Sequence, residues 1–402
     1  MSLVDSTIWW QVYPLGALDA PIREPEEGLH HRLQGLLPWL DYVVKLGCSG
    51  LLLGPVFAST SHGYDTLDHY RIDPRLGDEA DFDRLVAGCR TRGLSLMLDG
   101  VFNHVGVRHP WVAENSPLLK RVGGKLAGWE GHGDLVELDH ANPAVADEVT
   151  AIMLHWLRRG IAGWRLDVAY AVPTPFWAEV TDRVRVEFPD AVFLGEVIHG
   201  DYAALARDGH LDSITAYELW KATWSSIADA NFFELAHAVR RHTAFSSDLV
   251  LNTFSGNHDV DRMASLAGMD GAAVAAAALF ALPGMPSVYY GDEQAFTGTR
   301  HTGYHADDAV RPPLPPAPSD LFDSGAWLHA VYQHLIGLRR RHPWLSRALV
   351  EVAENTNTTI SWRCTARAED AAAAPFVDVS LQLEPARFSL VFSDGEEWSW
   401  SR

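Results

Sequence analysis

The chain alternates short apolar runs with longer segments in which apolar residues recur at helical spacing. Helix-like segments such as 78–93 and 142–160 end in glycine after an arginine, a common helix stop. Strands that alternate with helices form parallel sheets, so the pattern predicts an α/β fold. Eight units within about 340 residues match a closed (β/α)8 TIM barrel, with a doubly wound open sheet as the alternative. The eight predicted strands are residues 8–13, 50–55, 94–99, 163–167, 191–196, 213–218, 249–254 and 286–291.

Two stretches depart from this repeat. One follows the third predicted strand, is rich in glycine, histidine and tryptophan, and indicates a short insertion. After Arg341 the pattern changes to short β-like runs, which predict a small C-terminal β domain. The expected organisation is a barrel formed by residues 1–106 and 139–342, an inserted subdomain at 107–138 and a C-terminal β domain at 343–402.

Composition narrows the class of partner. The chain has 402 residues, of which 47% are hydrophobic and 21% charged, as expected for a globular protein. Basic residues number 32 against 52 acidic ones, which gives a formal net charge of −20. Because phosphate groups require a basic surface, we expect neither nucleic acid nor a membrane as partner. A neutral or cationic ligand fits this charge better.

Cysteines and apolar stretches point to a cytoplasmic protein. Cys48, Cys89 and Cys364 are odd in number and far apart, which indicates reduced thiols. The first residues, MSLVDSTIWWQVYP, lack the basic and apolar regions of a secretory signal. The longest apolar stretch, 272–290, is interrupted by prolines and predicts a buried helix and a strand rather than a membrane span.

Acidic side chains follow four of the predicted strands. Asp99, Asp167, Glu196 and Asp259 stand at the ends of the third, fourth, fifth and seventh strands. Each alone is explained by a turn or a helix cap, and Arg165 with Asp167 by a structural ion pair. Together they would meet on one rim of a barrel, where such enzymes place their chemistry. The cost of burying several charges there indicates a functional site.

Four segments carry a family resemblance. LDGVFNHVG, GWRLDVAY, FLGEV and FSGNHD, in this order, resemble the signature regions of the α-amylase family of glycoside hydrolases. PVFASTSHGYDTLDHYRIDPRLGD and ELDHANPAV resemble the branch of cyclomaltodextrinases, neopullulanases and maltogenic amylases. The resemblance covers roughly the first 340 residues and implies a B-type role for the insertion at 107–138.

The resemblance implies roles for individual residues. Asp167 would be the nucleophile, Glu196 the general acid/base and Asp259 the carboxylate that stabilises the transition state. Asp99 would buttress the site. An adjacent guanidinium is expected to lower the pKa of Asp167 and keep it ionised. The residues expected to bind substrate are Tyr64, His104, Arg165, His258, Arg311 and Asp308.

The activity implied is retaining hydrolysis of α-glucosidic bonds, mainly α-1,4, in maltooligosaccharides or related α-glucans. It would pass through a covalent glycosyl-enzyme intermediate. A transglycosylase or sugar isomerase acting on α-glucosides is the first alternative, since it would share the same carboxylates. A non-catalytic carbohydrate-binding subunit is the second.

Departures from the family pattern shape the remaining expectations. Calcium-dependent amylases carry a histidine four residues after the nucleophile, and here that position is Ala171, so we expect no metal and no cofactor. The first strand begins at about Ile8 with no preceding β domain, so we expect a monomer. Trp111 and Trp129 in the insertion are candidates for contacts with a sugar at the rim.

Overall fold

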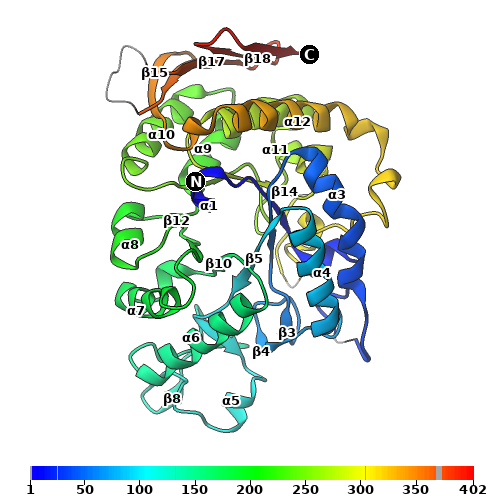
Figure 1. The fold of residues 1–402 in the computed structure, drawn as a ribbon, viewed down its shortest axis with the longest axis vertical. Helices are drawn as coiled ribbons and strands as arrows, with labels where there is room; N and C mark the ends of the chain where they lie inside the picture. Colours follow the sequence, from blue (N-terminus) through cyan, green and yellow to red (C-terminus); the bar gives the residue numbers. More distant parts are fainter. Residues whose placement is uncertain (1, 25, 132, 304, 368–373) are drawn as a thin grey trace.

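A parallel barrel forms the centre of the molecule (Figure 1). The computed structural model describes residues 2–24, 26–131, 133–303, 305–367 and 374–402. Its eight strands run in the order β12-β11-β10-β5-β2-β1-β14-β13, and a parallel bridge between Thr215 and Asn252 joins the two ends. The predicted TIM barrel is confirmed, and the open sheet is not formed. The strands are β1 (Trp9–Val12), β2 (Gly50–Leu53), β5 (Ser95–Gly100), β10 (Gly163–Leu166), β11 (Val192–Gly195), β12 (Ser213–Ile214), β13 (Asn252–Phe254) and β14 (Met285–Tyr289).

One predicted strand extended into a helix. The segment 213–218 was expected to be extended, but β12 ends at Ile214 and a helix begins at Tyr217. The apolar alternation of this segment reflects burial on both sides of a tight strand-to-helix connection, and periodicity alone does not separate the two.

Helices surround the barrel (Figure 1). One of them, α11, is long and apolar enough to cross a membrane by length and composition, yet its residues from 271 to 281 are all buried within the protein. It is therefore a core helix, as the interrupted apolar stretch predicted. The helices are α1 (Leu3–Ser6), α2 (Pro14–Ala17), α3 (Leu37–Leu46), α4 (Glu79–Thr91), α5 (Pro110–Ala113), α6 (Pro143–Arg158), α7 (Thr174–Arg185), α8 (Tyr202–Asp208), α9 (Tyr217–Ala228), α10 (Phe232–Phe245), α11 (Met263–Ala281) and α12 (Ala326–Arg341).

Two excursions stand at the carboxyl ends of the barrel strands. A hairpin of β3 (Phe57–Ser59) and β4 (Thr66–Ile72) follows β2. The insertion after β5 begins with β6 (His104–Gly106), which pairs antiparallel with β9 (Leu135–Glu137). Between them lie α5 and the short strands β7 (Arg121–Val122) and β8 (Lys125–Leu126).

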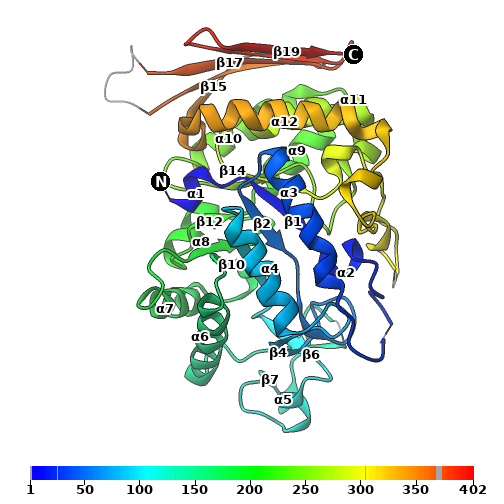
Figure 2. The ribbon, with the colours of Figure 1, turned by 45° about the vertical axis from the view of Figure 1, so that its right-hand side comes forward.

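The C-terminal segment forms a single antiparallel sheet, which lies over α11 and α12 at the opposite end of the molecule from the insertion (Figure 2). Its buried side chains, Ile360 and Trp362 among them, belong to the same continuous hydrophobic cluster as the barrel. Trp400 stacks on Trp327 of α12, with ring centroids 5.7 Å apart. The sheet therefore has no separate core within the described residues. Its strands are β15 (Leu349–Asn355), β16 (Thr359–Thr365), β17 (Phe376–Gln382), β18 (Arg387–Phe392) and β19 (Glu397–Ser401).

Candidate active site

The side chains expected at the site come from different strands but lie on one rim. Asp99 is part of β5, Arg165 part of β10, and Asp167 and Glu196 directly follow β10 and β11. The register of β10 with β5 pairs Arg165 with Asp99, so neighbouring strands present these residues at the same height. Asp167 and Glu196 are only 6% and 5% exposed.

The Arg165 guanidinium joins three carboxylates. Its Nη1 donates to Asp99 Oδ1 and Oδ2, each at 2.8 Å, and to Asp167 Oδ1 at 3.0 Å. Its Nη2 lies 2.5 Å from Glu196 Oε1. Arg165 and Asp167 stand two positions apart at the end of one strand, where side chains alternate between faces, so both reach the same side. The structure thus brings together the two expected reacting carboxylates and the aspartate expected to buttress them. We call Arg165, Asp99, Asp167 and Glu196 the Arg165 cluster.

Electrostatics differ from the sequence-based expectation. Burial raises the pKa of Asp167 well above its ordinary range; Arg165 lowers it, and the charges of Glu196 and Asp99 raise it further. Burial also raises the pKa of Asp99 to about 6. Arg165 lowers the pKa of Asp167, as expected, but burial and the neighbouring carboxylates outweigh it, because one cation is shared among three buried acids. Such a cluster favours keeping a proton.

Glu196 is held by two groups that the sequence did not reveal. Its Oε1 accepts a hydrogen bond from the Tyr217 hydroxyl at 3.2 Å, and its Oε2 accepts one from the Val168 amide at 3.0 Å. The Tyr217 hydroxyl in turn accepts from Asn257 Nδ2 at 2.8 Å. Tyr217 was assigned to a strand, which hid its position at the start of α9. Asn257 belongs to the GNHD motif, directly before His258 and Asp259, and this position in the sequence could have indicated that it belongs to the site.

Asp259 faces the cluster from the loop after β13. Its Oδ2 lies 3.0 Å from His258 Nε2, and its Oδ1 accepts from Arg311 Nη2 at 2.8 Å. Burial opposes the ionisation of Asp259, but His258 and Arg311 outweigh it and lower its pKa to about 2. Asp259 is therefore ionised at neutral pH.

Arg311 pairs with a different acid from the one expected. Asp308 lies 3.4 Å from Arg23 Nε and 2.7 Å from His305 Nδ1, whereas Arg311 Nη2 lies 3.3 Å from Asp307 Oδ2. The reason is local: residues 308–310 form a 3-10 turn, which brings the side chain four positions before Arg311 back over it. Asp307 is the residue that sequence reasoning missed.

Tyr64 and His104 line the cavity between the carboxylates. The Tyr64 hydroxyl donates to Asp99 Oδ2 at 3.0 Å and contacts His258 Nε2. His104 Nε2 donates to the Tyr64 carbonyl at 3.1 Å, and its ring stacks on Trp129. Trp129 also lines the cavity, as expected for a rim tryptophan. Trp111 instead packs on His109, with ring centroids 4.3 Å apart.

Two cavities meet at the carboxylates. One has a volume of about 470 Å³ and is lined by Asp167, Glu196 and Asp259. The other has about 560 Å³ and lies on the side of Asp259 and Arg311, with charged residues around it. The two share Tyr64 and Asp259 among their lining residues, so they adjoin each other at these two side chains.

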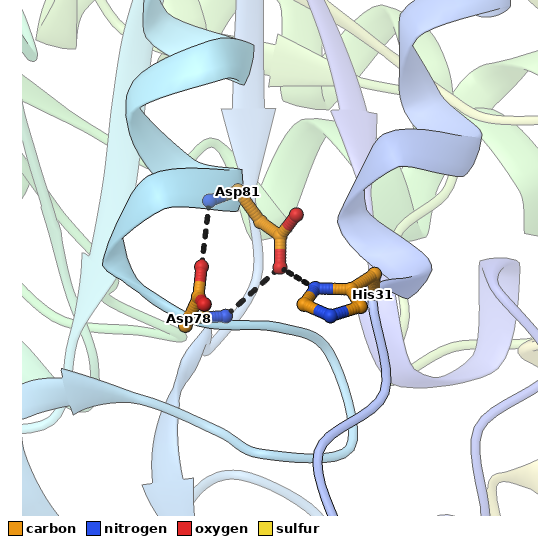
Figure 3. A group of neighbouring side chains, drawn as sticks. All are labelled: His31, Asp78 and Asp81. Atoms are coloured by element: carbon orange, nitrogen blue, oxygen red, sulfur yellow. Dashed lines mark hydrogen bonds and ion pairs between the residues drawn. The ribbon is translucent and has the colours of Figure 1, made fainter.

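Two groups of side chains outside the cleft have the chemistry of cation ligands. In the first, Asp81 Oδ2 accepts from the Asp78 amide at 3.1 Å and lies 2.6 Å from His31 Nδ1, while Asp78 accepts from the Asp81 amide (Figure 3). This arrangement is a capping box that begins α4, and both carboxylate oxygens of Asp81 accept from protein donors. The second joins Asp394 and Glu396 to His342, which stacks on Phe392 beneath the C-terminal sheet.

Comparisons with known proteins agree with this geometry. The family model described as "Alpha amylase, catalytic domain" matches residues 25–119 and 130–312. Intracellular maltogenic amylase from Bacillus subtilis (strain 168) is 31% identical over 332 residues, covering 73% of this chain and 56% of that protein. Neopullulanase 2 from Thermoactinomyces vulgaris is 30% identical over 347 residues, covering 79% of this chain and 57% of that protein. The chain thus spans little more than half the length of these relatives.

Solved structures share the whole fold. Cyclic alpha-maltosyl-(1→6)-maltose hydrolase from Arthrobacter globiformis superposes with a TM-score of 0.80 at 23% identity, covering 100% of this chain and 99% of that one. At this identity the likeness shows the fold alone. The family model, by contrast, covers well over half of the chain, including every carboxylate of the Arg165 cluster. The chain therefore belongs to the α-amylase family.

Proposed function

We propose that the protein hydrolyses α-glucosidic bonds, mainly α-1,4, in maltooligosaccharides or related α-glucans, with retention of configuration. The observation that carries the proposal is the Arg165 cluster, in which Asp167 and Glu196 face one cavity from adjacent strands. Retaining cleavage needs one carboxylate as nucleophile and a second, protonated one as acid, close to one anomeric carbon.

In the first step, Asp167 attacks the anomeric carbon and forms an ester while Glu196 protonates the departing glycosidic oxygen. In the second, Glu196 takes a proton from water, which attacks the same carbon and releases Asp167. The scheme requires a proton on Glu196 and a negative charge on Asp167. Positive charge developing on the sugar stabilises ionised Asp167, whose ionisation burial disfavours.

The remaining residues position the sugar. Asp259, which stays ionised at neutral pH, accepts hydrogen bonds from sugar hydroxyls and stabilises the cationic transition state. The Tyr64 ring stacks beneath the sugar, while His104, His258 and Arg311 complete its hydrogen bonds. Asp307, rather than Asp308, accompanies Arg311 in this role.

The substrate class is supported by the names of the relatives, which include cyclomaltodextrinase, maltogenic amylase and neopullulanase. Two of these relatives are named intracellular, which supports a cytoplasmic location. A monomer without cofactor, metal, nucleic-acid or membrane partner remains our prediction, and light scattering tests the oligomeric state. The barrel, insertion and C-terminal β domain are proposed to act as one unit.

The deciding experiment is product analysis. Maltose, maltotriose, cyclodextrin, pullulan, sucrose and trehalose are incubated with the protein, and the products and their initial anomeric form are read by NMR. We expect glucose and maltose from maltotriose, released first as α-anomers, and nearly complete loss with Asp167→Ala. Longer or rearranged sugars would establish the transglycosylase or isomerase instead, and binding without turnover the non-catalytic subunit.

A further inference from the structure

A cavity at the amino-terminal end of the barrel strands has no part in the proposed reaction. Its volume is about 420 Å³, which is within the range of pockets that hold small molecules. Of its lining residues, Ile8 and Ser49 directly precede β1 and β2, Ser95 begins β5, and Gly284 directly precedes β14. The Arg165 cluster stands at the carboxyl ends of the strands, so this cavity lies at the opposite end of the barrel. We call it the basal cavity.

Arg339 of α12 lines the basal cavity and is only 5% exposed. Its Nη1 donates to the carbonyls of Phe280 at 3.0 Å and Leu282 at 2.5 Å, and its Nη2 donates to the Gly284 carbonyl at 2.5 Å. A guanidinium has five N–H groups, so the N–H of Nε and one N–H of Nη2 have no acceptor within the described residues. Nε and Nη2 share one edge of the planar group, and such an edge binds two oxygens of a carboxylate or phosphate side by side.

The charge of Arg339 is only partly balanced by the protein. Its acceptors are carbonyls at and just after the end of α11, and it forms no ion pair with a carboxylate of the described residues. The carboxyl end of a helix carries about half a negative charge, so about half of the positive charge remains. Burial lowers the pKa of Arg339 to about 10, which leaves the group charged at neutral pH. An anion bound beside it would stabilise this buried charge.

The other charges at the basal cavity also favour an anion. Arg340 is exposed, donates through Nη1 to the Gly47 carbonyl at 3.1 Å, and forms no ion pair within the part of the chain that the structure describes. Among the described lining residues Asp5 is the only acid, and Arg347 Nε lies 2.5 Å from its Oδ1. Two arginines without a carboxylate partner therefore line one cavity, in a chain whose formal net charge is −20.

Three hydroxyl groups add uncharged donors to the lining. Thr7 is 3% exposed, yet its hydroxyl has no hydrogen-bond partner among the described residues and is available to a ligand. The Ser49 hydroxyl accepts from the Ile8 amide at 3.2 Å, which leaves its hydrogen to donate, and the Ser95 hydroxyl is half-buried. Two guanidinium groups and three hydroxyls offer more donors than the two oxygens of a carboxylate accept. A phosphate group, with three strong acceptor oxygens and a charge of about −2, matches them better.

We propose that the basal cavity binds the phosphate group of a small molecule, with Arg339 and Arg340 as its charged partners and the three hydroxyls as further donors. The ligand would connect the segment before β1 to α12 and to the first residues of β2, β5 and β14. Because only the folded chain assembles these donors, a bound phosphate stabilises the fold by mass action. It does so without contact with Asp167 or Glu196, which line a different cavity.

The test is isothermal titration calorimetry of the whole chain at constant ionic strength. The ligands are inorganic phosphate and glycerol 3-phosphate, which has no glucosyl unit for the catalytic cavity, and glycerol is the neutral counterpart. We expect saturable binding of both phosphates and none of glycerol. Phosphate should also raise the Tm, whereas sodium chloride at the same ionic strength should not. Tighter binding of glycerol 3-phosphate assigns the site to an organic phosphate, and equal affinity assigns it to the inorganic ion.

Variants locate the binding site. Because Arg339 also holds the end of α11, the test uses the other donors. We expect Arg340→Gln to weaken phosphate binding by about 10-fold and Thr7→Val, which replaces the hydroxyl with a methyl group, by about 5-fold. Arg240→Gln removes an exposed arginine of α10 outside the lining and is the matched control, which should keep the wild-type affinity. All three variants should keep wild-type activity on maltotriose.

Two results would overturn the inference. One is the absence of saturable binding by either phosphate in the wild type. The other is an equal affinity for phosphate in Arg340→Gln and Arg240→Gln, since the anion would then bind elsewhere, for example at Arg311 beside Asp259. Neither result depends on which sugar the protein cleaves, so the inference and the proposed function fail separately.

Discussion

Arg165 Nη1 lies 2.8 Å from both carboxylate oxygens of Asp99, the residue paired with it on the neighbouring strand. Asp99 is fully buried and does not itself line the cavity that holds Asp167 and Glu196. This contact holds the guanidinium on the side away from the cavity, while the same guanidinium also contacts Asp167 and Glu196. The positions of Asp167 and Glu196, the carboxylates proposed to react, thus depend in part on one buried ion pair.

We expect Arg165→Lys to lower kcat about 100-fold while the protein stays folded. Lysine keeps the charge but offers one point of contact, so it does not bridge Asp99, Asp167 and Glu196 at once. A displacement of about 1 Å at a reacting group costs this much. Steady-state kinetics on maltotriose with circular dichroism as control measure the effect, and wild-type kcat in the lysine variant would show that the bridge is dispensable.

Glu196→Gln should separate the two chemical steps. Fluoride needs no proton to leave, so we expect α-maltosyl fluoride to release a burst of about one fluoride per enzyme, followed by slow turnover. On maltotriose, the loss of the general acid lowers kcat/KM by about 10²–10⁴-fold. Mass spectrometry should find maltosyl attached to Asp167 after the burst. A burst that persists in Asp167→Asn would contradict the assignment of the nucleophile.

Arg262 holds the loop that carries Asp259. It is fully buried, and its guanidinium donates to the carbonyls of Tyr290 and Val310 and to Asp292 Oδ1. We expect Arg262→Met to destabilise the protein by about 3–5 kcal/mol, because it leaves Asp292 buried and unpaired. Urea unfolding measures this, and the double variant with Asp292→Asn should recover part of the loss. A double variant no more stable than the single one would argue against the pair.

Trp362 tests whether the C-terminal sheet and the barrel share one core. It is 1% exposed, in the sheet face that packs on the barrel helices. We expect Trp362→Ala to cost about 3–5 kcal/mol and calorimetry to show one cooperative transition for the whole chain. Arg363→Ala, which removes an exposed ion pair with Asp378 and a cation–π contact with Phe376, should cost only about 1 kcal/mol. Two separate transitions in the wild type would refute a shared core.

Acid should destabilise the protein through buried neutral histidines. Burial lowers the pKa of His242 to about 4, although its hydrogen bond to the Pro283 carbonyl, at 2.8 Å, acts in the opposite direction. An unfolded histidine has a pKa of about 6.5, so between these values the unfolded state binds an extra proton. Stability is therefore present above about pH 6.5 and is lost as the pH falls towards 4, by about 2 kcal/mol at pH 5.

The measurement is urea unfolding at pH 7 and pH 5. In His242→Gln, whose amide N–H still reaches the Pro283 carbonyl, we expect the fall in stability between the two pH values to shrink by about 2 kcal/mol. His301→Gln, which removes an exposed histidine, is the matched control. An unchanged fall in His242→Gln would place the acid sensitivity elsewhere.

Much of the barrel could be predicted because its strands and helix ends are marked by short stretches of the sequence. Strands buried on both faces read as short apolar runs, and glycines after basic residues mark helix ends, so eight strands could be located without any contact map. The charged pair in GWRLD and the acidic strand ends placed Asp167 and Glu196 on one rim, because parallel strands of a barrel end at one face. The β-rich tail was likewise visible as alternation.

Contacts between distant segments were decided only by the tertiary structure. No periodicity links Tyr217 to Glu196 or Trp220 to the cleft, and choosing Asp307 over Asp308 required the path of one 3-10 turn. The raised pKa of Asp167 is a sum over burial and four neighbouring charged groups, and only Arg165 lies close to Asp167 in the sequence. The sequence alone determined which side chains end the strands, since each buried strand is a short apolar run whose end can be seen in the sequence. The fold decided how those side chains share charge and space, since both depend on every segment that packs around them.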